Sequence, residues 1–258
     1  MVNHSISVLV IGATGGLGSA LAQHYARPGV SLSLWGRDRE RLEMIARLCV
    51  AKRAAVEIRS QDLTKIAEAR AALLADDARA RFDLVIFASG RGDVRPAGAV
   101  VEDPETVAAM VALNFAAPAA LATALAETMA ARGQGRIVLV GSAAAFHALP
   151  FATAYSGTKA GLARFADALR LAVRERGVHV MLVSPGFIDT AAGRHVPGPK
   201  PMLMAPDAVA ARIDRAVQRR QAHLVLPWPF AALRWFDRLL PQFLRDRLLL
   251  SLAPPPGT

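Results

Sequence analysis

Short apolar runs rich in β-branched residues alternate along this chain with longer amphipathic stretches, and no other feature constrains the fold as much. A run such as Ile137-Val138-Leu139-Val140 is apolar at every position, which is typical of a strand buried on both faces. Repeated strand–helix–strand order places such strands in a parallel sheet that is covered by helices on both sides. The sequence therefore predicts a doubly wound α/β fold with a mostly parallel sheet of seven strands.

The predicted strands and helices follow one another in strict alternation over most of the chain. The strands are expected at residues 7–11, 31–34, 55–59, 84–88, 136–140, 179–183 and 224–226. The helices are expected at residues 16–27, 39–50, 64–80, 104–132, 154–176 and 206–219. In a sheet of this kind, ligands bind at the carboxyl ends of the strands, where the strand order reverses.

A glycine-rich turn lies between the first predicted strand and the first predicted helix. It reads Ile11-Gly12-Ala13-Thr14-Gly15-Gly16-Leu17-Gly18. Glycines let a backbone turn tightly and approach a pyrophosphate, while the helix N-terminus supplies free N–H groups. At this position the motif favours a Rossmann-like dinucleotide site over a plain turn. Both Gly12/Gly16/Gly18 and Gly12/Gly15/Gly18 fit nucleotide turns, so the spacing leaves the subtype open.

The end of the second strand indicates which dinucleotide is preferred. An NAD site carries an acidic residue there, whereas this chain has Gly36 followed by Arg37. A guanidinium binds a 2′-phosphate through paired hydrogen bonds, so we predict NADP(H), with NAD(H) possible. The alternative is that Arg37 is a solvated residue before the second helix. Thr14 and Asp62 are candidate adenosine contacts, and Asp62 could equally be the N-cap of the helix expected near Thr64.

Four polar residues in apolar surroundings form the candidate catalytic set: Asn114, Ser142, Tyr155 and Lys159. The four-residue gap places Tyr155 and Lys159 on one helix face. A nearby ammonium favours the phenolate, so we expect a lowered pKa that makes Tyr155 a general acid or base. Ser142 follows a strand and could hydrogen-bond a substrate oxygen. Each residue alone also has an ordinary structural explanation, but together with the glycine turn they favour catalysis.

These motifs resemble those of the short-chain dehydrogenase/reductase family over residues 7–190. The resemblance rests on the glycine turn, on Asn114, on Ser142 and on Tyr155 with Lys159, with the tyrosine thirteen residues after the serine. The segment Ser184-Pro185-Gly186-Phe187-Ile188-Asp189-Thr190 also resembles the family's Pro-Gly segment after the sixth strand.

The resemblance implies a role for each catalytic residue. Tyr155 would exchange the proton and Ser142 would polarise the carbonyl. Lys159 would hold the nicotinamide ribose and lower the tyrosine pKa, and Asn114 would hold a water molecule in a proton relay. The cofactor-binding set would comprise Gly12, Thr14, Gly15, Gly16, Leu17, Gly18, Arg37, Asp62, Ala88, Ser89, Gly90, Tyr155, Lys159, Pro185, Gly186, Ile188 and Thr190.

The sequence departs from the family pattern at two places in the cofactor site. Ile11 stands where many members have threonine, and Ala88-Ser89-Gly90 replaces Asn-Ala-Gly after the fourth strand. That asparagine normally ties the strand to the nucleotide turn. The glycine spacing also resembles epimerase-like and NmrA-like relatives, which rank lower because they are longer or lack the Ser–Tyr–Lys set.

Composition excludes several classes of protein. The chain has 258 residues and one cysteine, Cys49, which rules out a disulfide-stapled scaffold. Its net charge of +10 suggests anionic ligands, but its arginines are spread over helices, so we expect no nucleic-acid partner. No metal-ligand spacing occurs, so no metal is expected. Without a signal peptide or an uncharged apolar stretch of about 20 residues, a cytoplasmic protein is expected.

The C-terminal third is expected to contain a substrate lid and an extension. Residues 1–227 would form the catalytic domain, with a lid at residues 191–204 that is rich in Pro and Gly and whose Met202, Leu203 and Met204 give it an apolar inner surface. An ordinary surface loop is the alternative. Residues 228–258 would be an amphipathic extension that packs on the domain, forms the interface of a homodimer or homotetramer, or contacts a membrane peripherally.

The sequence thus predicts an NADP-dependent oxidoreductase that transfers a hydride between nicotinamide and a carbonyl or alcohol. Phe146, Leu149, Phe151 and Phe187 near the expected site suggest a hydrophobic small-molecule substrate. The alternatives are a non-catalytic NADP(H)-binding sensor or scaffold and an epimerase-like relative.

Overall fold

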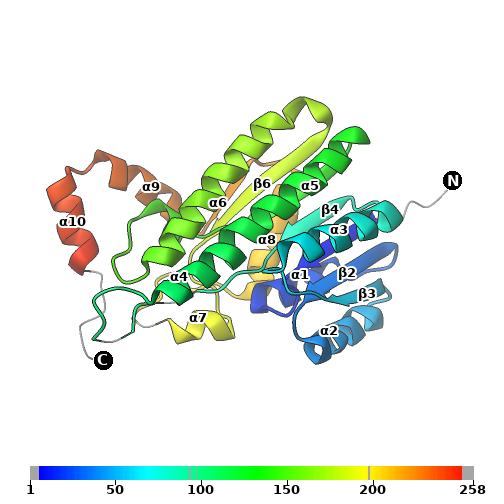
Figure 1. The fold of residues 1–258 in the computed structure, drawn as a ribbon, viewed down its shortest axis with the longest axis horizontal. Helices are drawn as coiled ribbons and strands as arrows, with labels where there is room; N and C mark the ends of the chain where they lie inside the picture. Colours follow the sequence, from blue (N-terminus) through cyan, green and yellow to red (C-terminus); the bar gives the residue numbers. More distant parts are fainter. Residues whose placement is uncertain (1–5, 93, 97, 197, 252–258) are drawn as a thin grey trace.

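In the described part of the chain, seven parallel strands form one sheet at the centre of the fold. The computed structural model describes residues 6–251 apart from 93, 97 and 197 (Figure 1). The strands are β1 (Ile6–Ile11), β2 (Val30–Gly36), β3 (Ala55–Ser60), β4 (Leu84–Phe87), β5 (Gly135–Val140), β6 (Val178–Pro185) and β7 (His223–Leu226). Their order is β3-β2-β1-β4-β5-β6-β7, and every pairing is parallel. The predicted Rossmann-like architecture is confirmed.

Helices connect the strands and continue beyond the last one. They are α1 (Gly16–Tyr25), α2 (Arg39–Ala51), α3 (Ile66–Ala80), α4 (Pro104–Val111), α5 (Ala117–Ala131), α6 (Thr153–Ala172), α7 (Ala191–His195), α8 (Pro206–Gln218), α9 (Pro229–Leu239) and α10 (Gln242–Ser251). A π-helical turn, η1 (Ala112–Ala116), joins α4 to α5, and two short 3₁₀ turns are η2 (Ala143–Phe146) and η3 (Arg174–Arg176).

Two hydrophobic cores lie on opposite faces of the sheet. Alternating residues of β1 divide between them: Val8 and Val10 point to one face, and Leu9 and Ile11 to the other. The first core is completed by residues of α1, α2 and α8, and the second by residues of α3, α5 and α6. Because both faces are covered, the run Leu84–Phe87 of β4 and the run Ile137–Val140 of β5 are apolar at every position, which is the pattern from which the sequence predicted buried strands.

The strand order reverses between β1 and β4, which places a crevice at their carboxyl ends. At this point the Ala88 N–H donates a hydrogen bond of 2.8 Å to the Ile11 carbonyl. The glycine turn after β1 and the segment after β4 therefore lie side by side.

The segment 104–131 differs from the sequence-based expectation in two ways. A single helix was predicted, but the π-helical turn η1 interrupts it and contains Asn114. The expectation that no stretch could span a bilayer is also wrong, because Pro104–Ala131 is long and apolar enough by length and composition. In this structure α5 packs against the sheet through residues such as Leu121, Leu125 and Met129.

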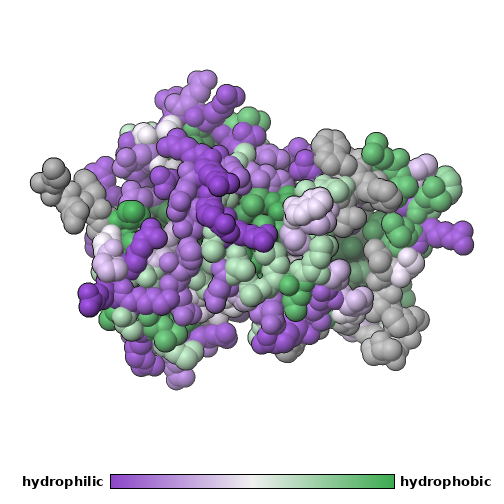
Figure 2. All heavy atoms as spheres, turned by 180° about the vertical axis from the view of Figure 1, so that it is seen from behind, coloured by the Kyte–Doolittle hydropathy of each residue, from purple (hydrophilic) through white to green (hydrophobic). Residues whose placement is uncertain are grey.

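The C-terminal extension forms two helices with different surroundings. Phe230 of α9 packs against Gly186 at the end of β6, so α9 lies on the domain. In α10, Phe243, Leu248 and Leu250 remain 70%, 45% and 63% exposed. Figure 2 shows hydrophobic residues at this end of the molecule. The predicted lid segment contains α7, and its Pro197 lies outside the described residues.

Candidate active site

The glycine turn is so tightly packed that two of its positions admit no side chain. Gly12 has a φ of +88°, and a Cβ there would lie 2.5 Å from the Ser89 nitrogen. A Cβ on Gly18 would lie 2.1 Å from the Gly12 carbonyl oxygen. The N-cap of α1, Gly15, makes no side-chain hydrogen bond, and the first turn holds no acidic residue. The N–H groups of this helix end are therefore suited to an anion.

The glycine turn also meets the segment that follows β6. A Cβ on Gly16 would lie 2.5 Å from Cγ2 of Thr190. Thr190 is fixed because its hydroxyl accepts a hydrogen bond of 3.0 Å from the Gly193 N–H at the start of α7. Nearby, Ile188 pairs with Met204. The structure thus brings together two motifs that lie about 170 residues apart in the sequence.

A cavity of about 210 Å³ opens between the glycine turn, the end of β2 and the segments that follow β3 and β4. Its lining residues are Ile11, Gly12, Thr14, Gly15, Trp35, Gly36, Arg37, Gln61, Leu63, Ala88, Ser89, Gly90 and Leu113. Most of the predicted contacts to the adenosine and pyrophosphate are among them. Sequence reasoning missed Trp35, Gln61, Leu63 and Leu113. Their positions offered a signal: Trp35 lies at the end of β2, Gln61 and Leu63 follow β3, and Leu113 precedes Asn114.

The residues that line the cavity suit the adenosine and phosphate groups of a dinucleotide. The Ser89 hydroxyl is buried without a hydrogen-bond partner among the described residues, so it remains available to a ligand. A Cβ on Gly36 would lie 2.7 Å from Thr14, and one on Gly90 would lie 3.3 Å from the Lys159 ammonium. Among the described residues that line this cavity none is a carboxylate, whereas the exposed Arg37 is one of them. These residues could hold NADP(H).

Asp62 does not line the cavity. Its Oδ1 accepts hydrogen bonds from the Thr64 N–H at 2.9 Å and from the Thr64 hydroxyl at 2.8 Å. These two bonds lower the pKa of Asp62. The suggestion that Asp62 caps the following helix is wrong, because that helix begins at Ile66 and Asp62 closes the turn before it.

Asn114 connects the catalytic helix to the segment after β4. It is fully buried, and its side chain accepts a hydrogen bond from the Arg91 N–H and donates one to the Arg91 carbonyl, both at 2.8 Å. Its Nδ2 also lies 3.4 Å from the Thr158 hydroxyl of α6. The π-helical turn places Asn114 in this position. Thr158 was not singled out from the sequence.

Ser142, Tyr155 and Lys159 converge beside the cavity. Ser142 lies two residues after β5, accepts a hydrogen bond of 3.1 Å from the Ala144 N–H, and is close enough to the Tyr155 side chain to affect the pKa of the phenol. The Lys159 ammonium is buried, lies 5.9 Å from the centre of the Tyr155 ring, and donates a hydrogen bond of 3.1 Å to the Val140 carbonyl. The helical spacing predicted the Tyr–Lys pair, and the fold brings the predicted Ser142 beside it.

The direction of the Tyr155 pKa corrects the expectation from the sequence. Burial raises the pKa of Tyr155 above its ordinary value, and the hydrogen bond with Ser142 opposes this only in part. Burial also lowers the pKa of Lys159 to about 8. Desolvation therefore dominates both groups, because Lys159 is buried, Tyr155 is half-buried and the ammonium is directed at the Val140 carbonyl.

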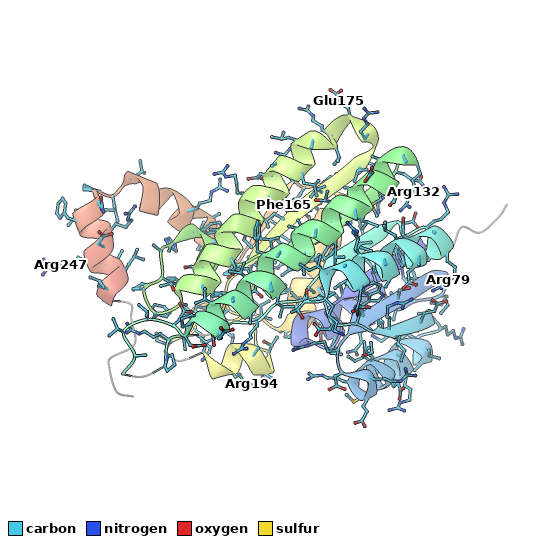
Figure 3. The ribbon with its side chains drawn as sticks, viewed as in Figure 1. Arg79, Arg132, Phe165, Glu175, Arg194 and Arg247 are labelled. Atoms are coloured by element: carbon cyan, nitrogen blue, oxygen red, sulfur yellow. The ribbon has the colours of Figure 1, made fainter. Side chains whose placement is uncertain are left out.

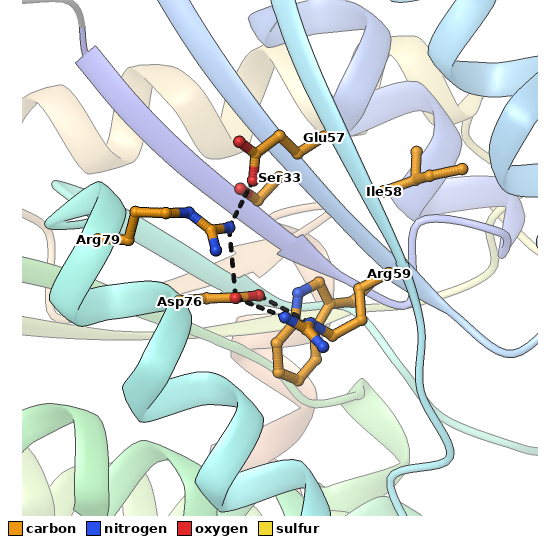
Figure 4. Close-up of a pocket in the computed structure, with 7 residues that line it drawn as sticks. Ser33, Glu57, Ile58, Arg59, Asp76 and Arg79 are labelled. Atoms are coloured by element: carbon orange, nitrogen blue, oxygen red, sulfur yellow. Dashed lines mark hydrogen bonds and ion pairs between the residues drawn. The ribbon is translucent and has the colours of Figure 1, made fainter.

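A smaller cavity of about 30 Å³ lies between β2, β3 and α3 (Figure 4). Its charged groups are paired with one another: Arg59 donates to Asp76 at 2.6 and 2.9 Å, and Arg79 donates to Glu57 at 2.6 Å. The Arg59 guanidinium also lies 5.6 Å from the Trp35 ring centre. Trp35 lines both cavities, so this ion-pair cluster supports one wall of the larger one.

Comparison with known proteins agrees with this geometry. The sequence profile of the family described as short chain dehydrogenase matches residues 7–198. An uncharacterized oxidoreductase of Myxococcus xanthus is 32% identical over 241 residues, covering 93% of this chain and 94% of that protein.

Two solved structures share the complete fold. A short-chain dehydrogenase from Sphingobium yanoikuyae in complex with NADPH has a TM-score of 0.80 and 28% identity, with 98% of each chain covered. A bulky-bulky ketone specific alcohol dehydrogenase from Comamonas testosteroni has a TM-score of 0.77 and 25% identity, covering 99% of this chain and 97% of that one. With its glycine turn and parallel sheet, this chain belongs to the short-chain dehydrogenase family and is an NAD(P)-dependent oxidoreductase.

Proposed function

We propose that this protein is an NADPH-dependent reductase of hydrophobic ketones, in which Tyr155 is the general acid. The observation that carries this proposal is the placement of Ser142, Tyr155 and Lys159 beside a cavity that the glycine turn and the segment after β4 line. In the opposite direction NADP⁺ would be the oxidant that accepts the hydride of a secondary alcohol, and Tyr155 would accept the hydroxyl proton.

Each catalytic side chain has a distinct task in this proposal. The nicotinamide supplies the hydride when the cofactor is bound. The Ser142 hydroxyl holds the substrate oxygen, and Tyr155 donates its proton to that oxygen as negative charge develops there. The raised pKa keeps Tyr155 protonated at neutral pH, which suits reduction. Lys159 binds the ribose hydroxyls of the cofactor, and Asn114 holds a water molecule for the proton relay.

The preference for NADPH rests on Arg37. Its side chain is exposed at the rim of the cavity, directly after β2, and no carboxylate among the lining residues would repel a 2′-phosphate. The Sphingobium yanoikuyae relative was solved with NADPH, which agrees with this assignment. Asp62 stays a proposed contact to the adenosine through its remaining oxygen, and Ile188 and Thr190 stay proposed contacts to the carboxamide.

The substrate proposal follows from apolar residues of the segments that follow β5, β6 and β7. Phe146 and Phe187 are half-buried near the end of β5 and after β6, and Phe230 of α9 packs against Gly186. The relative from Comamonas testosteroni is specific for bulky-bulky ketones. We therefore propose ketones with two large apolar substituents, covered by the lid segment 191–204.

A turnover assay tests the proposal directly. The purified protein is incubated with NADPH or NADH and a panel of ketones, and cofactor oxidation is followed. The expected result is NADPH-dependent reduction of bulky ketones that Tyr155→Phe abolishes while NADPH still binds. A sensor or scaffold would bind NADPH without turnover in any assay, and an epimerase would convert substrate without net oxidation of NADPH.

The exposed side chains of α10 support a contact surface. Phe243 and Leu248 lie exposed beside Arg245 and Arg247, a pattern suited to an anionic membrane surface. We propose that the protein is cytoplasmic, that it forms a homodimer or homotetramer, and that α10 contacts the membrane peripherally.

A flotation assay tests the membrane contact. Phe243→Glu should reduce flotation with anionic vesicles, whereas Leu48→Glu, at an exposed position of α2, should not. If neither protein floats and Phe243→Glu dissociates the oligomer, the surface is a subunit interface.

A further inference from the structure

The helix that carries Tyr155 and Lys159 begins without a capping side chain of its own. The N-cap residue of α6, Ala152, makes no side-chain hydrogen bond, and the first turn contains no acidic residue. Helix N-terminal N–H groups need partners, and a carboxylate is the most favourable one. Tyr155 lies in this first turn, so whatever fixes the turn also fixes the phenol.

A buried carboxylate from another part of the chain takes the place of the cap. Glu102, which precedes α4, is only 6% exposed. Its Oε2 accepts a hydrogen bond of 3.0 Å from the Ala154 N–H and a short one from the Thr153 hydroxyl. Its Oε1 is buried and has no hydrogen-bond partner among the described residues. A carboxylate that is buried this deeply is costly unless its contacts are needed.

The same connection between β4 and α4 touches the catalytic elements at two more points. The Asn114 side chain holds the backbone of Arg91, and the Arg95 N–H donates a hydrogen bond of 2.8 Å to the Phe151 carbonyl. The residue after Phe151 is the N-cap of α6. The segment that lines the cavity at Ser89 and Gly90 is therefore fastened to the start of the catalytic helix, and Glu102 provides the charged contact.

We propose that Glu102 is a positioning residue for the reaction: it caps α6 from outside and holds the Tyr155 hydroxyl against Ser142. This inference rests on the proposed role of Tyr155. Glu102 touches neither reacting group, and its effect passes through the backbone of residues 153 and 154. A small displacement of a proton donor is enough to slow catalysis strongly.

The test compares Glu102→Ala, Glu102→Gln and the matched control Glu105→Ala, an exposed glutamate three residues away on α4. Glu102→Ala is expected to lower kcat about tenfold to hundredfold while the Kd for NADPH stays unchanged. Glutamine keeps an oxygen that can accept both bonds, so Glu102→Gln should recover most of the lost kcat. Glu105→Ala should behave like the unaltered protein.

A second readout does not depend on turnover. The chain has two tyrosines, and burial together with the Asp214 carboxylate raises the pKa of Tyr25 far above its ordinary value. Near-ultraviolet titration of tyrosinate therefore reports on Tyr155, with Tyr155→Phe as the blank. In Glu102→Ala the Tyr155 pKa should fall, because a loosened turn admits water to the phenol.

Three results would overturn the proposal. The first is that Glu102→Ala has the same kcat and the same Tyr155 titration curve as the control Glu105→Ala. The second is a parallel loss of kcat and NADPH affinity that glutamine does not restore, which would make Glu102 a general stabiliser. If Glu102→Ala does not fold, Thr153→Val is used instead, because it removes one of the two contacts to Glu102. A normal kcat for Thr153→Val is the third result that would overturn the proposal.

The proposed function can fail separately. Absence of turnover in the unaltered protein would contradict the proposed function, while the titration would still show whether Glu102 positions Tyr155.

Discussion

The Lys159 ammonium donates a hydrogen bond of 3.1 Å to the Val140 carbonyl, which ties the catalytic helix α6 to the end of strand β5. Ser142 lies two residues beyond Val140, so this bond sets the distance between the strand that carries the serine and the helix that carries Tyr155. Burial of the ammonium in this position lowers the pKa of Lys159 to about 8.

This pKa predicts the pH dependence of carbonyl reduction. Below a pH of about 8, Lys159 is charged in the free protein, and above it the neutral amine predominates. Tyr155 stays protonated over this range because burial raises its pKa. We therefore expect kcat/KM for NADPH to decrease as the pH rises through about 8. A pH–rate profile measures this decrease in kcat/KM. If the same decrease occurs at the same pH in Lys159→Arg, the assignment to Lys159 is contradicted.

Arg37 should control the choice between the two nicotinamide cofactors. Loss of a charge-assisted contact to the 2′-phosphate costs about 1.5–3 kcal/mol, so Arg37→Ala should weaken NADPH binding about tenfold to hundredfold and leave NADH binding unchanged. Quenching of tryptophan fluorescence gives both Kd values, because Trp35 lines the cavity. Arg39→Ala, which removes an exposed arginine paired with Glu43, is the control. Equal weakening of both cofactors would refute this role.

Gly12 should tolerate no side chain, because a Cβ there would collide with the backbone at Ser89. This collision can be measured separately from backbone strain. Gly12 and Gly29 both have positive φ values, +88° and +79°, but only at Gly12 would a Cβ meet other atoms. Gly29→Ala should cost about 1–2 kcal/mol of unfolding free energy from conformation alone. Gly12→Ala should cost more and also abolish NADPH binding. Urea unfolding and the Kd for NADPH measure the two effects, and equal behaviour of both variants would contradict this explanation.

A buried ion pair joins α3 to the end of α5. The Arg132 guanidinium donates to Asp77 at 2.6 and 3.0 Å and to the Phe82 carbonyl at 2.7 Å, and Figure 3 shows Arg132 at this junction. Arg132→Ala leaves the nearly buried carboxylate without its cation, so unfolding free energy should fall by about 3–5 kcal/mol.

The exposed pair of Arg39 and Glu43 provides the comparison, because Arg39→Ala should change stability by at most about 1 kcal/mol. Both variants should retain kcat at low temperature, since neither residue lies at the cavity. Denaturant unfolding measures the difference, and a similar small change for both would contradict the importance of burial.

The sequence predicted the sheet and most of the glycine turn because these depend on local patterns. The seven strands appear where apolar runs were found, and the glycines after β1 occur where the backbone must bend closely around Gly12. The Tyr155–Lys159 pair follows from helical spacing. The helix interruption at Asn114 was not predicted, because an apolar helix and a π-helical turn share the same composition.

What only the tertiary structure decided are the contacts between residues far apart in the chain. Asn114 holds Arg91, Arg132 neutralises Asp77, and Glu102 caps the helix of Tyr155. The direction of the Tyr155 pKa belongs to the same group: the sequence shows an amine one helical turn away, but only the fold shows how far the phenol is withdrawn from water. Desolvation of a group depends on all the atoms that surround it in the folded protein, so it cannot be predicted from the spacing of residues along the chain.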